Sequence, residues 1–223
     1  MIDTSTLMTF DEHLSAWAAD RPDRLAMREE DRFWSYAQLE ERTARAATWL
    51  LAQGVVKGDR IAWIGKNSDL YFTIFYGAAR LGVVMAPIGW RLAPPEQAYI
   101  INDTHAKIVF TGPGFDDVAK ALEGQLEHGP QFVTAAQGYA LLDQTERAPF
   151  EGSGPDDAIL QLYTSGTTGN PKGVPLSNRN LFGLRKNSIN SDLAYTKWED
   201  DEVVLVAMPC AHIGGTGLGV MAI

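Results

Sequence analysis

The chain has 223 residues, of which 45% are hydrophobic and 21% are charged, a composition typical of an ordinary globular protein. This length suits one large domain or two small ones and is ample for a hydrophobic core. With 28 acidic against 19 basic side chains the net charge is −9, which argues against nucleic acid or an anionic membrane as the main partner.

The predicted elements indicate an α/β protein. The capping patterns Thr9/Glu12 and Ser35/Gln38 predict the starts of two helices. Apolar runs that suit strands then alternate with segments of helical periodicity. The predicted strands are 24–27, 33–36, 59–64, 83–87, 107–111, 132–133, 158–163 and 202–208, and the later helices are 68–81, 94–101, 115–126 and 177–190. Strands separated by helices of this length predict mostly parallel sheets flanked by helices.

Two segments have a composition that suits loops rather than regular elements. Residues 137–157 are rich in Gly, Pro and acidic residues, and we predict an exposed subdomain connector there. Residues 203–223 contain no Asp, Glu, Lys or Arg and have the length of a membrane span. However, Pro209, His212 and four glycines favour a buried strand followed by a glycine-rich active-site loop. We therefore expect no transmembrane segment.

The cysteine and histidine content limits the chemistry. Cys210 is the single cysteine, which excludes an internal disulfide and favours a reducing cytoplasm. The four histidines are far apart, so their spacing predicts no metal site. The start of the chain carries Asp11 and Glu12 without an apolar core segment, unlike a signal peptide. These features predict a cytoplasmic protein.

Residues 163–173, Tyr-Thr-Ser-Gly-Thr-Thr-Gly-Asn-Pro-Lys-Gly, are the segment that most directly indicates a function. The segment combines glycine backbone N–H groups, several hydroxyls and one cation, and it has little side chain to bury. Such a loop suits a phosphate chain, because oriented amides bind anion oxygens and a lysine neutralises their charge. The apolar run before it predicts a buried strand that holds the loop. We interpret the segment as a nucleotide phosphate loop.

Three well-known motifs do not fit this loop or its surroundings. A P-loop GxxxxGK(S/T) counted from Gly166 would need glycine at Pro171 and a hydroxyl residue at Gly173. A Rossmann GxGxxG is approached only by residues 214–219, where the spacing is wrong. The serine-hydrolase elbow GxSxG is absent around Ser165.

The loop instead resembles the phosphate-binding signature of adenylate-forming enzymes, which include acyl-CoA synthetases, luciferases and peptide-synthetase adenylation domains. Other segments that resemble this family are 36–43, 54–61, 86–92, 97–100, 106–109 and 208–215. Within the family, residues 90–92, Thr168 and His212-Ile-Gly-Gly favour an acyl-CoA synthetase. Gly89 and the pair at 210–211 depart from the common pattern, so the acyl specificity is left open.

The resemblance implies ATP-dependent activation of a carboxylic acid, with a fatty acid favoured. The carboxylate attacks the α-phosphate of Mg-ATP to give acyl-AMP and pyrophosphate, and the coenzyme A thiolate then displaces AMP. The implied partners are the small-molecule acid, ATP with Mg²⁺, and coenzyme A as cosubstrate. Two alternatives stay open: an acyl-AMP ligase that loads a carrier protein, and a non-catalytic nucleotide-binding fragment. The oligomeric state, monomer or homodimer, is open as well.

The resemblance also implies roles for individual residues. Lys172 would neutralise the departing pyrophosphate, and His212 would line the carboxylate channel between the nucleotide and acyl sites; these are the predicted catalytic residues. The predicted nucleotide-binding residues are Thr164, Ser165, Gly166, Thr167, Thr168, Gly169, Asn170, Pro171 and Lys172. Thr164 is also the predicted magnesium ligand, and Gly214 and Gly215 join His212 in substrate binding. The alternatives are a core histidine held by a backbone carbonyl and plain turn glycines.

The apolar run 217–223 at the end of the sequence predicts a continuation against which it packs. In the resembled family, the adenine-binding segment, a magnesium-binding glutamate, a ribose-binding aspartate and the lysine of a mobile C-terminal domain lie farther along. We therefore expect residues 1–223 to be the N-terminal portion of an AMP-binding domain. We also expect this chain alone to make no acyl-AMP, while its full-length parent does.

Overall fold

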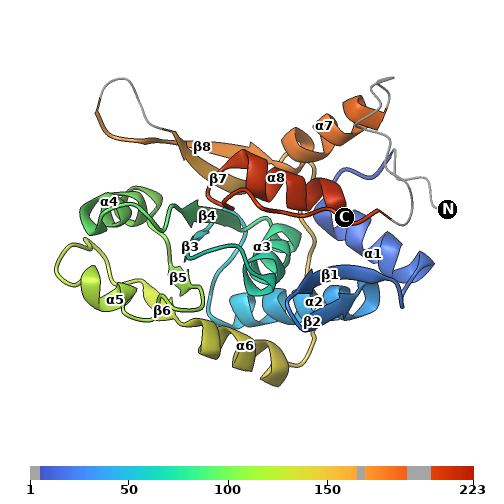
Figure 1. The fold of residues 1–223 in the computed structure, drawn as a ribbon, viewed down its shortest axis with the longest axis horizontal. Helices are drawn as coiled ribbons and strands as arrows, with labels where there is room; N and C mark the ends of the chain where they lie inside the picture. The colour runs from blue at the N-terminus through green and yellow to red at the C-terminus, as the bar shows by residue number, and fades with distance from the viewer. Residues whose placement is uncertain (1–5, 165–168, 190–201) are drawn as a thin grey trace.

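The computed structural model describes residues 6–164, 169–189 and 202–223. Its elements are α1 (Phe10–Asp20), β1 (Leu25–Glu29), β2 (Arg32–Ser35), α2 (Tyr36–Ala52), β3 (Arg60–Ile64), α3 (Asp69–Leu81), β4 (Val84–Ile88), α4 (Pro94–Thr104), β5 (Ile108–Thr111), α5 (Val118–Ala121), β6 (Gln131–Val133), α6 (Ala135–Gln144), β7 (Ala158–Thr164), β8 (Lys172–Ser177), α7 (Asn178–Ile189) and α8 (Ile213–Ala222) (Figure 1). The alternation of strands and helices confirms the predicted α/β class.

A six-stranded sheet of order β6-β5-β3-β4-β7-β8 forms the centre of the fold. The strands from β6 to β7 are parallel, and β8 is an edge strand that pairs antiparallel with β7. Ile61 of β3 is in register with Met85 of β4 and Ile108 of β5. The sheet is therefore mostly parallel, as predicted, while β1 and β2 form a separate antiparallel hairpin.

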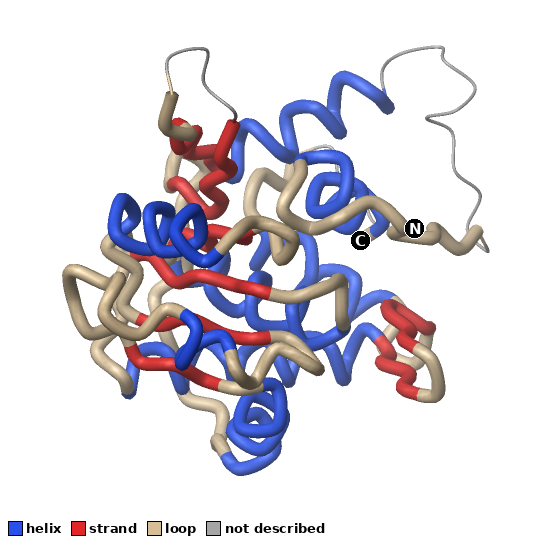
Figure 2. Tube along the Cα trace, turned by 60° about the vertical axis from the view of Figure 1, so that its left-hand side comes forward, coloured by secondary structure: helices blue, strands red, loops and turns tan. Residues whose placement is uncertain are grey.

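Both faces of this sheet are covered by helices (Figure 2). Successive side chains of a strand point to opposite faces, and those of β3 divide in this way. Ile61 and Trp63 belong to a core cluster with α1, α2 and α3. Ala62 and Ile64 belong to a second cluster with α4. The two cores explain why the parallel strands are almost continuously apolar.

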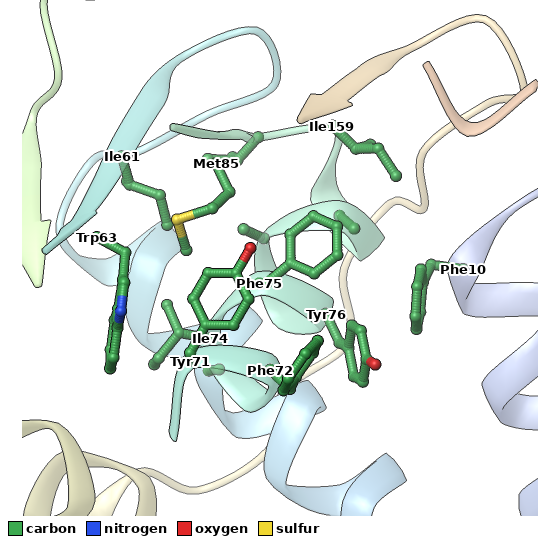
Figure 3. Close-up of a cluster of buried hydrophobic side chains, with 14 of the residues drawn as sticks. Phe10, Ile61, Trp63, Tyr71, Phe72, Ile74, Phe75, Tyr76, Met85 and Ile159 are labelled. Atoms are coloured by element: carbon green, nitrogen blue, oxygen red, sulfur yellow. The ribbon is translucent and has the colours of Figure 1, made fainter. Parts of the chain in front are cut away.

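Helix α3 is buried on all sides, and its aromatic side chains fill the larger core (Figure 3). Tyr71 and Phe75 stack with ring centroids 6.0 Å apart. The helix is bounded by clear local signals: the Ser68 hydroxyl accepts from the Tyr71 N–H at 3.0 Å, and Gly82 takes a left-handed conformation with φ 69°. Between the charged residues Asp69 and Arg80 near its ends the helix is almost entirely apolar, which suits a place inside a protein.

Capping boxes fix the two helices packed outside α3. Thr9 and Glu12 cap α1 reciprocally, and Ser35 and Gln38 do so for α2, which confirms both predicted starts. The buried guanidinium of Arg80 on α3 then ties these helices together. It donates to carboxylates of Asp11 on α1 at 2.6 Å and Glu40 on α2 at 2.9 Å.

Asp69, at the start of α3, binds the β1–β2 hairpin and α6. Its carboxylate, 1% exposed, accepts from Arg32 at 3.0 Å, from Trp34 Nε1 at 2.9 Å and from the Tyr139 hydroxyl at 2.5 Å. Burial alone would raise the pKa of Asp69, but hydrogen bonds with Glu29, Arg32, Tyr139 and Trp34 hold it well below its usual range. This ionised carboxylate therefore fixes the hairpin against the core.

The predicted strand 202–208 is wrong. The backbone from 202 to 207 is irregular, no strand of the described chain pairs with it, and Val203 and Leu205 are 84% and 82% exposed. Its apolar, β-branched composition favours a strand, but strand composition does not supply a partner. Instead, the side chain of Asn67 binds the carbonyl oxygens of Val206 and Met208.

Other segments differ from prediction in their local structure. The expected glycine-rich loop at 214–219 is part of α8. The first part of the expected connector 137–157 is helical, because Thr134 and Gln137 form a capping box that starts α6. The helix expected at 115–126 is reduced to the four residues of α5. None of the helices in the described ranges is long and apolar enough to cross a bilayer.

Candidate functional site: the phosphate-loop hairpin and the start of helix α8

The predicted phosphate loop connects two hydrogen-bonded strands, β7 and β8. Thr164 is the last residue of β7 and lies opposite Lys172, the first residue of β8. Both side chains are exposed. Directly opposite residues of an antiparallel pair share one face of the sheet, with Cβ atoms about 5 Å apart. The hairpin therefore presents a hydroxyl and an ammonium group together at the end that carries the loop.

The tip of the loop is described only in part. Ser165, Gly166, Thr167 and Thr168, four of the predicted nucleotide-binding residues, lie outside the described residues. Gly169 has φ 115°, a conformation that L side chains rarely adopt, and no atom of the described residues lies within 4 Å of the position its Cβ would take. The loop therefore needs glycine at 169 for backbone conformation rather than for space. Asn170 and Pro171 follow and lead into Lys172.

A hydrogen-bonded cluster fixes the loop end of the hairpin to helix α4. The Tyr163 hydroxyl donates to Asp103 Oδ2 at 2.5 Å and accepts from Gln161 Nε2 at 3.0 Å. Burial, and then the neighbouring Asp103 carboxylate, raise the pKa of Tyr163 well above its usual value. Gly173 faces this cluster, and a Cβ at 173 would overlap the Gln161 amide and lie 3.0 Å from Tyr163 Cζ. The side chains leave room for no larger residue at 173 without rearrangement.

The second group of predicted residues lies at the start of α8. His212 is the N-cap residue, and its carbonyl oxygen accepts from Gly215 N at 3.0 Å and Thr216 N at 3.2 Å. Its side chain makes no capping hydrogen bond and is exposed. The ring is therefore available at the surface rather than held in the core.

The glycines after His212 allow close packing within the chain itself. A Cβ on Gly215 would overlap the carbonyl oxygens of Pro209 and Met208, and one on Gly214 would lie 2.6 Å from Met208 Cε. From the sequence, these glycines were expected to let a substrate come close. In the structure they let residues 208–209 pack closely against α8. Only glycine at 215 permits this contact with backbone atoms.

Cys210 lies in the same turn and is buried. Burial raises the pKa of its thiol to about 12. The thiolate is the nucleophilic form, so a thiol that stays protonated at neutral pH is unsuited to covalent catalysis.

Thr164 is the one described residue among the predicted magnesium ligands. Thr164 presents an exposed hydroxyl, and no group of three or more Asp, Glu, His or Cys side chains in the described ranges is arranged to hold a metal. Mg²⁺ usually keeps several waters and is held by one or two protein oxygens together with substrate phosphates. Thr164 therefore fits as one ligand of a magnesium ion carried in by a nucleotide.

The structure thus forms two groups from the predicted residues: Thr164 with Lys172, and His212 with Gly214 and Gly215. Among the described residues no hydrogen bond or ion pair links one group to the other. Sequence reasoning missed the supporting side chains Asp103, Gln161 and Asn67. Only Gln161 left a signal, as a polar residue inside the apolar run 158–163. The other two act on segments far away in the chain.

Comparison with known sequences finds curated relatives that are named as ligases. A fatty acid–acyl-carrier-protein ligase, ScoC from Streptomyces coeruleorubidus, is 36% identical over 214 residues, which cover 94% of this chain and 40% of the relative. The long-chain-fatty-acid–CoA ligase FadD13 from Mycobacterium tuberculosis is 41% identical over 185 residues, covering 80% of this chain and 36% of the relative. The chain therefore spans well under half the length of these curated relatives.

A solved structure and a family model agree with these relatives. The inhibitor-bound N-terminal domain of FACL13 from Mycobacterium tuberculosis has a TM-score of 0.83 and 30% sequence identity to this chain, and the match covers 96% of this chain and 54% of that one. The model of the AMP-binding enzyme family matches residues 14–223, a range that includes both groups of candidate residues. The chain belongs to the AMP-binding enzyme family.

Proposed function

We propose that the protein uses ATP to convert a carboxylic acid to its acyl adenylate and then transfers the acyl group to the thiol of coenzyme A. The observation that carries the proposal is the family match over residues 14–223, which contains the complete β7–β8 hairpin with Thr164 opposite Lys172. A fatty acid is the proposed substrate, because two relatives are named as fatty-acid ligases. The proposal concerns the whole protein.

In the first proposed step, a carboxylate oxygen of the acid attacks the α-phosphorus of ATP, and the bond to pyrophosphate breaks. Negative charge grows on the departing pyrophosphate. Lys172 would neutralise that charge, while the Thr164 hydroxyl and the backbone N–H groups of the loop would hold the β- and γ-phosphates. Magnesium bound with the nucleotide would add further charge neutralisation, with Thr164 as one ligand. The chain thus contributes mainly position and charge.

In the second proposed step, the thiolate attacks the acyl carbon and AMP leaves. We assign His212 to the border between the nucleotide and acyl sites, where its exposed ring would line the path of the carboxylate. Gly214 and Gly215 would contribute by keeping the turn at 208–209 packed on α8. In this proposal the hairpin holds phosphate and the start of α8 orients the acid.

The experiment is carboxylate-dependent ATP–pyrophosphate exchange by the protein expressed from its complete coding sequence. Lys172→Ala should lower the exchange rate by about 10²- to 10³-fold, the usual cost of removing one group that stabilises transition-state charge. Lys120→Ala is the matched control, because Lys120 is an exposed lysine on α5, a different part of the surface. An absence of exchange with fatty, aryl and small acids alike would refute the proposal.

A second candidate function has a specific observation in its favour. The relative with 36% identity over 94% of this chain is named as a ligase of an acyl carrier protein. Product formation with free coenzyme A should therefore be compared with acylation of a phosphopantetheinylated carrier. If only the carrier is acylated, the acceptor is a protein and the coenzyme A step is wrong.

A non-catalytic nucleotide-binding role is the remaining alternative. Isothermal titration with ATP of the wild type and Lys172→Ala, combined with the exchange assay, separates it from catalysis. ATP binding without exchange would support the non-catalytic role, and affinity unchanged by the substitution would show that this hairpin is not the site. Cytoplasmic location, homodimer formation and inactivity of the 223-residue chain by itself stay predictions; the exchange assay on that chain tests the last.

A further inference from the structure

The side chain of Asn67 binds three backbone groups of the segment that leads to His212. Asn67 lies between the end of β3 and Ser68, the N-cap of α3, and both of these elements belong to the core. Its Nδ2 donates to the carbonyl oxygens of Val206 at 2.9 Å and Met208 at 2.8 Å. Its Oδ1 accepts from the Cys210 N–H at 2.8 Å. Both amide protons and the carbonyl oxygen are thus used on this one segment.

A second hydrogen bond holds Cys210 through its carbonyl group. The carbonyl oxygen of Cys210 accepts from the Thr216 hydroxyl at 2.7 Å, and that hydroxyl lies 2.6 Å from the buried Tyr71 hydroxyl of α3. Thr216 also donates its backbone N–H to the carbonyl of His212. Residue 210 is therefore held through both its N–H and its C=O, two residues before His212.

These contacts replace the sheet ladder that the segment lacks. Residues 202–207 have no regular structure and expose Val203 and Leu205, so strand pairing does not position them. The carbonyls of residues 206 and 208 and the N–H of residue 210 are instead satisfied by one side chain. The contacts to the Val206 carbonyl and the Cys210 N–H are half-buried, so the loss of these partners is costly, while the contact to the Met208 carbonyl is exposed and adds less.

We propose that Asn67 is a positioning residue for the acyl-activation reaction, which acts by fixing the backbone at 206–210 and thereby the place of His212. The inference rests on the proposed function, in which His212 lines the carboxylate path. Asn67 itself is not assigned any contact with the substrate. Its role is to make the start of α8 rigid relative to the C-terminal end of β3.

Asn67→Asp tests this role with almost no change in size. The substitution replaces the donating amide by a carboxylate oxygen, which would face the carbonyl oxygens of Val206 and Met208 and repel them. Asn102→Asp is a matched control, because Asn102 also joins two distant backbone groups: its Nδ2 donates to Gln125 O at 3.0 Å and its Oδ1 accepts from Glu127 N at 2.9 Å. Asn102 lies on α4, away from α8.

The first measurement follows alkylation of Cys210, the single cysteine, by iodoacetamide in the folded chain. Its side chain is buried, so labelling reports opening of the turn at 208–210. Asn67→Asp should raise the labelling rate about tenfold or more, since several hydrogen bonds to this turn are lost. Asn102→Asp should leave the rate within about twofold. Equal rates in all three proteins would overturn the claim that Asn67 holds this turn.

The second measurement is a double-mutant cycle in the protein expressed from its complete coding sequence. If Asn67 acts through His212, Asn67→Asp should lower kcat/KM for the carboxylate about tenfold alone, but by less than about twofold in a His212→Ala background. An equal loss in both backgrounds would overturn the proposal, because it would show a merely structural effect. If Asn102→Asp lost as much activity as Asn67→Asp, the proposal would also be overturned.

The outcomes distinguish failure of the proposed function from failure of the inference about Asn67. If the wild type shows no carboxylate-dependent exchange, the proposed function fails, and the catalytic role of Asn67 falls with it, while the labelling result still measures the turn. If the wild type is active and the cycle shows no coupling, only the inference about Asn67 fails. Should Asn67→Asp not fold, Asn67→Ala removes the same hydrogen bonds without adding charge and decides the question by the same two measurements.

Discussion

Replacing Tyr163 with phenylalanine removes one oxygen atom beside the phosphate loop, at the loop end of the β7–β8 hairpin. That hydroxyl donates to Asp103 and accepts from Gln161. The aromatic ring stays, so packing is preserved and the hydrogen bonds are tested separately. Asp103 is exposed and turns to water after the substitution, whereas Gln161 is 7% exposed and loses its partner inside the protein.

The expected loss of stability follows from the exposure of the two hydrogen-bond partners, Asp103 and Gln161. A buried amide left without its acceptor costs about 1–3 kcal/mol, and an exposed carboxylate that can be hydrated adds little. We therefore expect Tyr163→Phe to lower the free energy of unfolding by about 2 kcal/mol at pH 7. For a chain of this size that corresponds to a drop in Tm of roughly 4–8 °C.

The pH dependence of this stability difference gives an independent check on the role of the Tyr163 proton. The pKa of Tyr163 is raised in the folded state, so the folded protein keeps the phenolic proton at pH values where the unfolded chain has lost it. This contribution is complete below about pH 10 and is lost as pH rises toward the folded pKa. The stability difference between wild type and Tyr163→Phe should therefore narrow above pH 10, by at most about 1.4 kcal/mol per pH unit.

Urea denaturation of the 223-residue chain at pH 7 to 11, followed by circular dichroism, measures both effects. Tyr99→Phe is the control, because Tyr99 is a partly buried tyrosine of α4 whose hydroxyl makes no hydrogen bond with the described residues. A loss below about 0.5 kcal/mol at pH 7 would refute the account of the cluster. A difference that stays constant from pH 8 to pH 11 would refute the assignment of the tyrosine proton.

Two further substitutions test the packing around α3. Asp69→Asn should destabilise the chain by about 2–3 kcal/mol at pH 7, because it removes the negative charge of a buried carboxylate to which Arg32 and Trp34 donate. Its folded pKa is depressed, so its stabilisation is present above about pH 4 and lost below; urea midpoints that differ from wild type equally at pH 7 and pH 3 would contradict this. Gly219→Ala should lower stability by about 1–2 kcal/mol through overlap with the Phe72 ring. The control Gly183→Ala on α7 meets no atom of the described part of the chain within 4 Å and should raise the urea midpoint slightly.

Local signals in the sequence predicted local structure well. The capping boxes at Thr9 and Ser35 and the glycine at 82 mark helix boundaries within a residue of those in the structure. Each works through contacts with neighbours three or four positions away, so composition and spacing reveal it. The mostly parallel sheet could also be predicted, because apolar runs alternate with segments of helical periodicity along the chain.

Features that depend on distant partners left little trace. Residues 202–208 have strand composition, yet their conformation is set by Asn67, which lies more than 130 positions earlier. The edge strand β8 was missed because its polar and proline-containing sequence has no strand pattern of its own; its pairing with β7 forms it. In the candidate site, the motif identified Thr164 and Lys172, but not the Asp103 side chain that supports them.

The position of β8 at the margin of the sheet has a consequence for solubility. An edge strand presents unpaired backbone groups on which another chain can add a strand, and proteins limit this with lysine and proline. β8 carries both, Lys172 at its start and Pro175 in its middle, and Pro175 has no N–H to offer. One of the two residues that make β8 a poor template for strand addition, Lys172, is therefore also the residue proposed to neutralise phosphate charge.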